Sequence, residues 1–115
     1  MMLNWEEYRN QLIATIGEIA KTSPDLVRGY RTISDAGNKT AKLDPKTREL
    51  IALAVAVTVR CDGCITTHTD AAIKHGATRE EVVEALGVAI TVNAGAALVY
   101  SARTLDAFEA KKAAS

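Results

Sequence analysis

Two cysteines near the middle of the chain have the spacing that is typical of thiol-redox chemistry. Cys61 and Cys64 are separated by two residues, and the sequence has no other cysteine. A two-residue spacer brings two sulfurs within disulfide reach when the first cysteine lies at a helix start. The free amides and the positive dipole end of that helix start also stabilise a thiolate, which is the form that attacks a disulfide or a peroxide. The pair therefore predicts a reversible disulfide.

His68 is the second candidate, because it follows Cys64 by four residues and so shares one face of a helix with it. An imidazole in that position can accept the thiol proton or stabilise the thiolate as an imidazolium. Exposure at the helix start alone would favour Cys61 as the attacking sulfur, whereas His68 favours Cys64. We expect Cys64 to attack. Gly63, between the sulfurs, would allow close backbone approach to a disulfide substrate.

Two other interpretations of this segment remain open. The cysteines could be small buried residues beside a hydrogen-bonded histidine. Alternatively, Cys61, Cys64, His68 and His75 have the ligand types of a zinc site. Cys64 and His75 are separated by about 16 Å along a continuous helix, which is too far for one ion unless the helix breaks. We therefore expect neither a metal nor a cofactor.

Glu49 is the third candidate. Leu53 and Ala56 follow it at positions i+4 and i+7, so its carboxylate borders an apolar helix face. Such a group could orient His68 and raise its basicity, as an acid supports the histidine of a catalytic triad. The alternative is a solvated surface glutamate. Glu49 precedes Cys61 by about 18 Å of helix, so contact with His68 requires the next helix to fold back alongside.

The segments that must position these residues have the sequence patterns of helices, and no strand pattern is present. Capping residues or cap-plus-proline pairs predict helix starts at Asn4, Ser23-Pro24, Asp44-Pro45 and Thr78. The second helix should end near Gly37, the third should run from Pro45 to about Val59, and the fourth should start between Cys61 and Cys64 and stop at His75-Gly76. Asn93 and Gly95 predict a break before a last helix, which gives an all-α bundle of about six helices.

Composition predicts one soluble domain that associates with copies of itself. The 115 residues carry no net charge, which gives no electrostatic signal for nucleic acid or an anionic membrane. The third helix is apolar on every side, and apolar residues make up 48% of the chain with only 4% aromatic. Small side chains bury modest area, so we expect other copies to cover part of this surface.

The same data predict a cytoplasmic location. The N-terminus lacks the basic and apolar pattern of a signal peptide, and the apolar run from Leu50 to Val59 is too short to span a bilayer. Two cysteines in a single four-residue window are more typical of a reduced, catalytic pair than of a secreted disulfide scaffold.

Glu49, Cys61-x-x-Cys64 and His68 are separated by eleven and three intervening residues. This pattern resembles the core motif of the alkylhydroperoxidase D-like group, within the carboxymuconolactone decarboxylase family. The segment 76–86, Gly-Ala-Thr-Arg-Glu-Glu-Val-Val-Glu-Ala-Leu, is also similar to the segment that follows this motif in the family. The resemblance covers about residues 44–99 of a single domain that spans residues 1–115. Residues 1–43 resemble the family only in being helical.

The resemblance implies an all-α fold that assembles as a trimer or hexamer and acts as a thiol-dependent, peroxiredoxin-like hydroperoxide reductase. On this pattern Cys64 attacks the peroxide, Cys61 resolves the oxidised product, and Glu49 with His68 relays protons. The expected partners are a hydroperoxide substrate and a dithiol or lipoyl-type reductant.

The sequence departs from the best-studied branch of the family at Gly63, where that branch has a second histidine. A general thiol–disulfide oxidoreductase would therefore also fit, as would a non-catalytic helical oligomer that binds zinc or senses redox state. Lactone decarboxylases proper resemble the chain in fold but do not depend on a cysteine pair. The pair therefore argues against lactone decarboxylation.

Overall fold

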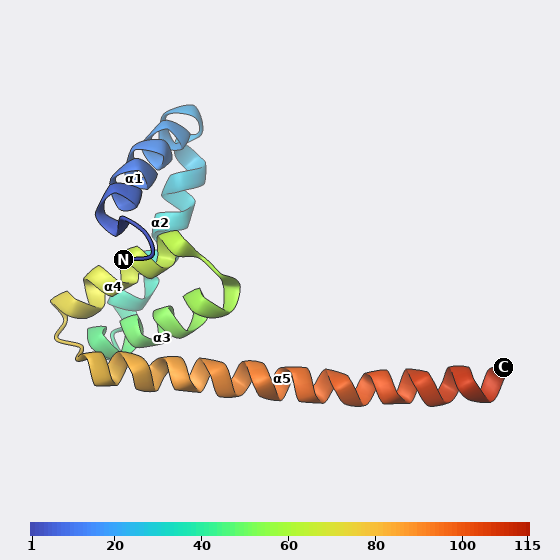
Figure 1. Ribbon diagram of the computed structural model, residues 1–115. Coiled ribbons are helices and arrows are strands. Elements are labelled where there is room, and N and C mark those ends of the chain that lie inside the picture. Colours follow the sequence, from blue (N-terminus) through green and yellow to red (C-terminus); the bar gives the residue numbers. More distant parts are fainter.

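The helices begin where the sequence predicts them. Asn4 Oδ1 accepts a hydrogen bond from the Glu7 amide at 3.1 Å, and Asp44 accepts one from the Thr47 amide at 2.9 Å. The computed structural model describes all 115 residues and contains no strand (Figure 1). Its five helices are α1 (Trp5–Thr22), α2 (Pro24–Thr40), α3 (Pro45–Val59), α4 (Asp62–Lys74) and α5 (Arg79–Ala114). The predicted all-α class is confirmed.

Helix α3 lies at the centre of the arrangement, because it packs against both α4 and α5. The α1–α2 hairpin stands on the opposite side of the α3–α4 pair from α5, and α1 packs on α4 (Figure 1). The core is small, and its buried residues are Leu53, Ala56, Thr66, Ala72 and Ala89. On α3, the apolar side chains of Ile51, Val55 and Val59 remain 48%, 54% and 64% exposed.

The end of α2 differs from the prediction, because the helix continues past Gly37 to Thr40. Gly37 does not terminate the helix but makes room for a side chain of α3. A Cβ at this position would lie 2.6 Å from Nη2 of Arg48, whose Nη1 donates to Asn38 Oδ1 at 2.7 Å. The helix ends instead at Thr40, and the next residue, Ala41, adopts the left-handed conformation with φ 49°.

The predicted break at Asn93 and Gly95 is wrong, so the chain has five helices and not six. The side-chain Nδ2 of Asn93 donates to the backbone carbonyl of Ala89 at 2.7 Å and to Oγ1 of Thr58 at 3.0 Å. Both bonds are compatible with a continuous helix, and the second one ties α5 to α3. Asn93 therefore serves as a contact between helices, not as a helix stop.

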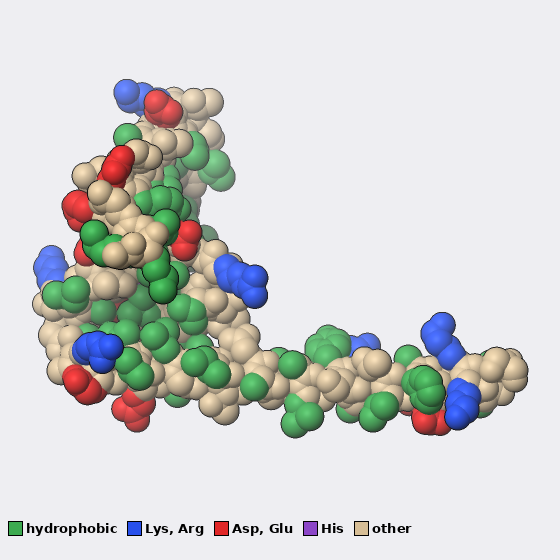
Figure 2. All heavy atoms as spheres, viewed as in Figure 1, with side chains coloured by type: hydrophobic (Ala, Val, Ile, Leu, Met, Phe, Trp, Pro, Cys, Tyr) green, Lys and Arg blue, Asp and Glu red, His purple; other side chains and the backbone are tan.

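Beyond Asn93, α5 forms an arm, residues 94–114, that extends away from the rest of the molecule (Figure 1). The only helix that α5 contacts is α3. The radius of gyration is 19.2 Å, whereas roughly 13 Å is usual for a compact chain of this length. Apolar side chains line the arm in Figure 2, and Leu98, Leu105 and Phe108 are 74%, 65% and 54% exposed. By length and composition alone, α5 is also long and apolar enough to cross a membrane.

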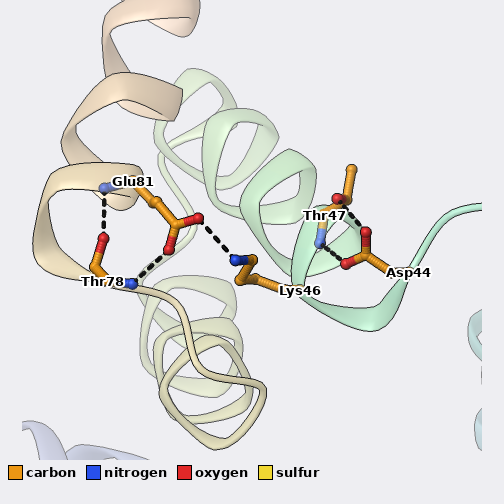
Figure 3. A network of polar contacts seen from close by, with 5 residues as sticks. All are labelled: Asp44, Lys46, Thr47, Thr78 and Glu81. Carbon is orange, nitrogen blue, oxygen red and sulfur yellow. Dashed lines mark hydrogen bonds and ion pairs between the residues drawn. The ribbon is translucent and has the colours of Figure 1, made fainter.

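The first turns of α3 and α5 are joined by the polar network in Figure 3. Lys46 Nζ lies 2.8 Å from Glu81 Oε2, and Glu81 Oε1 accepts the Thr78 amide at 2.9 Å. The hydrogen bond and charge of Lys46 hold the pKa of Glu81 below its ordinary value. At the start of α3, the amide and hydroxyl of Thr47 similarly lower the pKa of Asp44. These contacts fix how α5 leaves the α3–α4 pair.

This network predicts a pH-dependent effect of Glu81→Gln on stability. Because the pKa of Glu81 is lowered in the folded state, its contribution is present above the ordinary carboxyl value of 4.5 and is lost as pH falls through the lower folded value. The variant should unfold at a lower temperature than the wild type at pH 7. That difference should shrink as the pH falls toward 3, as thermal unfolding followed by circular dichroism would show. A difference that is constant with pH would contradict the role given to this carboxylate.

Candidate functional site

Cys61 and Cys64 form a disulfide at the start of α4, with their Cα atoms 5.2 Å apart. Cys61 is the N-cap residue of this helix, and its Sγ accepts a hydrogen bond from the Cys64 amide at 3.1 Å. The pair therefore lies at the end of α4 where backbone amides are free and the helix dipole is positive. These are the features that stabilise a cysteine thiolate when the disulfide is reduced.

A tight turn between α3 and α4 reverses the chain just before the pair. Arg60 adopts the left-handed conformation with φ 56°, and the Cys61 amide donates to the Ala56 carbonyl at 3.0 Å. As a result α4 packs back along α3. This is the reversal that a contact between Glu49 and His68 requires.

Glu49 and His68 do meet, because Nδ1 of His68 lies 2.6 Å from Oε2 of Glu49. Their side chains are 21% and 32% exposed, so the pair is partly shielded from water. A carboxylate can only accept, so Nδ1 of His68 carries a hydrogen and donates a hydrogen bond to Oε2 of Glu49. The other ring nitrogen, Nε2, then keeps its lone pair and can act as a base. His68 also lies one helical turn beyond Cys64, on the same face of α4.

His75 lies apart from this group. It is the exposed residue that ends α4, before Gly76 in the left-handed conformation with φ 83°. No three histidine, cysteine, aspartate or glutamate side chains converge as a metal site would require. The four candidate catalytic residues, in contrast, all lie in the region where α3 and α4 pack together.

Helix α1 adds a residue to this region that the sequence did not single out. Leu12 lies directly over Gly63, and a Cβ at residue 63 would be 2.6 Å from Leu12 Cδ2. An ion pair between Arg9 Nε and Asp70 Oδ2, at 3.0 Å, holds the same helix against α4. The space beside the Gly63 Cα, which was expected to admit a disulfide substrate, is therefore occupied by Leu12. The only sequence signal for Leu12 was its place on the apolar face of a helix.

The chemistry that these residues support is reversible thiol–disulfide exchange with a proton acceptor nearby. The two sulfurs can hold two electrons as a dithiol and release them by forming the disulfide. Glu49 accepts a hydrogen bond from His68, and His68 shares a helix face with Cys64. Nothing else in the chain combines nucleophile, base and orienting acid in this way.

Both the sequence and the fold of this chain are similar to those of known proteins. Residues 24–107 match the model of the carboxymuconolactone decarboxylase family. An uncharacterised protein of Haemophilus influenzae is 45% identical over 113 residues, which cover 98% of this chain and 100% of that protein. An uncharacterised protein from the cox locus of Paracoccus denitrificans is 34% identical over 92 residues, which cover 80% of this chain and 83% of that protein.

Solved structures agree with this assignment. A carboxymuconolactone decarboxylase family protein from Legionella pneumophila, in its apo form, superposes with a TM-score of 0.73 and 38% identity, covering 91% of this chain and 94% of that one. A protein from Methanobacterium thermoautotrophicum superposes with a TM-score of 0.68 and 30% identity, covering 73% of this chain and 94% of that one. On its sequence and its fold, the chain belongs to the carboxymuconolactone decarboxylase family.

Proposed function

We propose that the protein is a thiol-dependent hydroperoxide reductase of the alkylhydroperoxidase D-like type, acting in the cytoplasm. The observation that carries this proposal is the 2.6 Å contact between Glu49 and His68, on the same helix pair as the Cys61–Cys64 disulfide. A purely structural disulfide has no need of a carboxylate–imidazole pair beside it. A peroxidase does, because its thiol must lose a proton and its leaving oxygen must gain one.

In the reduced protein, Cys64 would first lose its proton to Nε2 of His68, with Glu49 stabilising the imidazolium that forms. The Cys64 thiolate then attacks the terminal oxygen of the hydroperoxide and the O–O bond breaks. The alcohol leaves with a proton from His68, and Cys64 becomes a sulfenic acid. The Cys61 thiol attacks that sulfur, water leaves, and the disulfide seen in the structure forms.

The cycle closes when an external dithiol reduces the disulfide by two successive exchanges and is itself oxidised to a disulfide. A dithiol of lipoyl type suits this step, because both of its sulfurs lie on one small molecule and can react in turn. A general thiol–disulfide oxidoreductase would use the same exchange steps but would not reduce peroxide. Peroxide reduction therefore distinguishes these two functions.

The decisive experiment measures peroxide consumption by the purified protein with dihydrolipoamide as reductant. Hydrogen peroxide and a small alkyl hydroperoxide should both be consumed catalytically. The matched control is the same protein reduced and then alkylated with iodoacetamide, which should be inactive. Reduction of disulfides without peroxide consumption above this control would leave only the oxidoreductase. Stoichiometric zinc in the reduced protein would favour a metal-binding role instead.

The proton relay makes a further prediction about His68→Gln and Glu49→Gln. Loss of the base should slow peroxide reduction on the order of a hundredfold or more, and loss of the orienting carboxylate should slow it less. The double variant should reduce peroxide at about the rate of His68→Gln alone, because both residues act on the same proton transfer. Rates of iodoacetamide alkylation at neutral pH should fall in the same order.

His75→Gln is the matched control for the relay, since His75 lies on the same helix but is exposed and makes no contact with Glu49. It should react at the wild-type rate. If the His68 and Glu49 variants also react at that rate while remaining folded, these residues are structural. The free amides at the start of α4 would then be the only feature that activates the thiol.

We propose in addition that the protein works as a homo-oligomer, a trimer or a hexamer. A helix that packs against nothing gains no tertiary stabilisation, and apolar side chains on several sides of the arm (residues 94–114) would face water in a monomer. The arm has no charged residue before Arg103, and its end carries charges of both signs. A second copy supplies the same uncharged, apolar surface and so matches it without electrostatic repulsion.

A further inference from the structure

The contact between Leu12 and Gly63 affects which reductants can reach the sulfurs of Cys61 and Cys64. Gly63 is one of the two residues between the cysteines, and a Cβ at this position would lie 2.6 Å from Cδ2 of Leu12, so the leucine side chain would have to shift to admit it. In a mixed disulfide, the partner's atoms must approach one sulfur along the S–S axis and must also fit beside the loop between the cysteines. Leu12 occupies one side of that loop.

Helix α1 packs against both α2 and α4. Trp5, Tyr8, Arg9 and Leu12 are its partly buried residues nearest α4, and Arg9 pairs with Asp70 at 3.0 Å. Ile13, the neighbour of Leu12, is 53% exposed. The helix therefore presents Leu12 to the loop through a defined contact and leaves Ile13 largely exposed.

We propose that Leu12 is a specificity-determining residue, which covers the loop between Cys61 and Cys64 and restricts the redox pair to small dithiols. This inference rests on the proposed function and deepens it by naming the class of reductant. A slim dithiol needs access to one sulfur at a time and can pass beside the leucine. A folded protein dithiol must lay its own backbone against the loop, and Leu12 stands in that space.

The experiment compares reduction of the oxidised protein by dithiothreitol and by reduced thioredoxin, a protein dithiol. Wild type should be reduced readily by dithiothreitol and slowly by thioredoxin. Leu12→Ala should accelerate reduction by thioredoxin about tenfold and alter reduction by dithiothreitol less than twofold, because it removes bulk and leaves the sulfurs unchanged. Ile13→Ala is the matched control and should alter neither rate. Equal acceleration with both reductants, or no acceleration with thioredoxin, would overturn the proposal.

A second measurement tests the contact itself, even if Leu12→Ala loosens α1. Gly63→Ala should lower the melting temperature in the wild-type background, because its Cβ collides with Leu12. In the Leu12→Ala background the same change should lower it much less. An equal loss in both backgrounds would show that Leu12 does not cover the loop. If dithiothreitol and thioredoxin reduce the protein at the expected rates but the protein does not consume peroxide, the proposed function is wrong while the role of Leu12 still holds.

Discussion

Cys64→Ser is expected to abolish peroxide turnover, whereas Cys61→Ser should still reduce one equivalent of peroxide. A serine hydroxyl at residue 64 stays protonated and is a poor nucleophile beside His68, so the rate should fall on the order of a thousandfold or more. Without Cys61, the sulfenic acid on Cys64 forms but has no neighbouring thiol to resolve it. Stopped-flow peroxide consumption and intact mass after reaction with dimedone would measure both results.

The two serine variants also decide which sulfur attacks. Cys61 is the N-cap residue of α4 and has the helix-start position, while Cys64 shares a helix face with the oriented imidazole. If the imidazole determines reactivity, a single turnover and the dimedone adduct appear only in Cys61→Ser. The opposite pattern, with the adduct on residue 61, would assign the attack to Cys61 and show that the helix-start amides outweigh His68. Wild type, which forms the disulfide, should show no adduct after full oxidation.

Local signals in the sequence predicted the helix starts and the position of the redox pair well. Caps such as Asn4, Asp44 and Thr78 act on amides within their own first turn, so their effect is visible in a few residues of sequence. The spacing of Cys61 and Cys64 has the same property. Features of this kind depend little on the rest of the fold, which is why they are predictable.

Contacts between distant segments were harder to predict. The meeting of Glu49 and His68 depends on a left-handed Arg60, a residue type that gives no signal for such a turn. Gly37 and Asn93 were interpreted as helix stops, but their roles come from Arg48 and Thr58 on another helix. Tertiary packing overrides local preference at such positions.

Family membership by itself does not determine the reaction. The family name refers to a decarboxylase, and the relatives from Haemophilus and Paracoccus are uncharacterised. The features of this chain that bear on the reaction are the cysteine pair and the Glu49–His68 contact, which lie on the same two helices. Lactone decarboxylation uses no thiol pair, so these residues favour redox chemistry within the family.

The arm (residues 94–114) carries the other prediction with a large expected effect, since Leu98→Glu should convert the oligomer to a monomer. Burial of a leucine side chain contributes about 1.5–3 kcal/mol, and an unpaired charge in its place costs more still. In a symmetric assembly this loss occurs once in every copy. Light scattering coupled to size-exclusion chromatography should show three or six subunits for wild type and one for the variant at micromolar concentration.

Ile33→Glu is the matched control, because Ile33 is an equally apolar residue, 78% exposed, on α2 and outside the arm. It should leave the oligomer intact, whereas dissociation by both variants would show that the arm has no special role. A monomeric wild type would contradict the assembly directly.

Because α5 has the length and composition of a membrane span, wild type should also be mixed with phosphatidylcholine vesicles. Firm binding to vesicles would mean that lipid covers the arm. We expect a second copy of the chain to cover it instead, because Ala89 of the same helix is already buried against protein. The apolar stretch of the helix is also interrupted by the polar residues Thr91, Asn93 and Ser101.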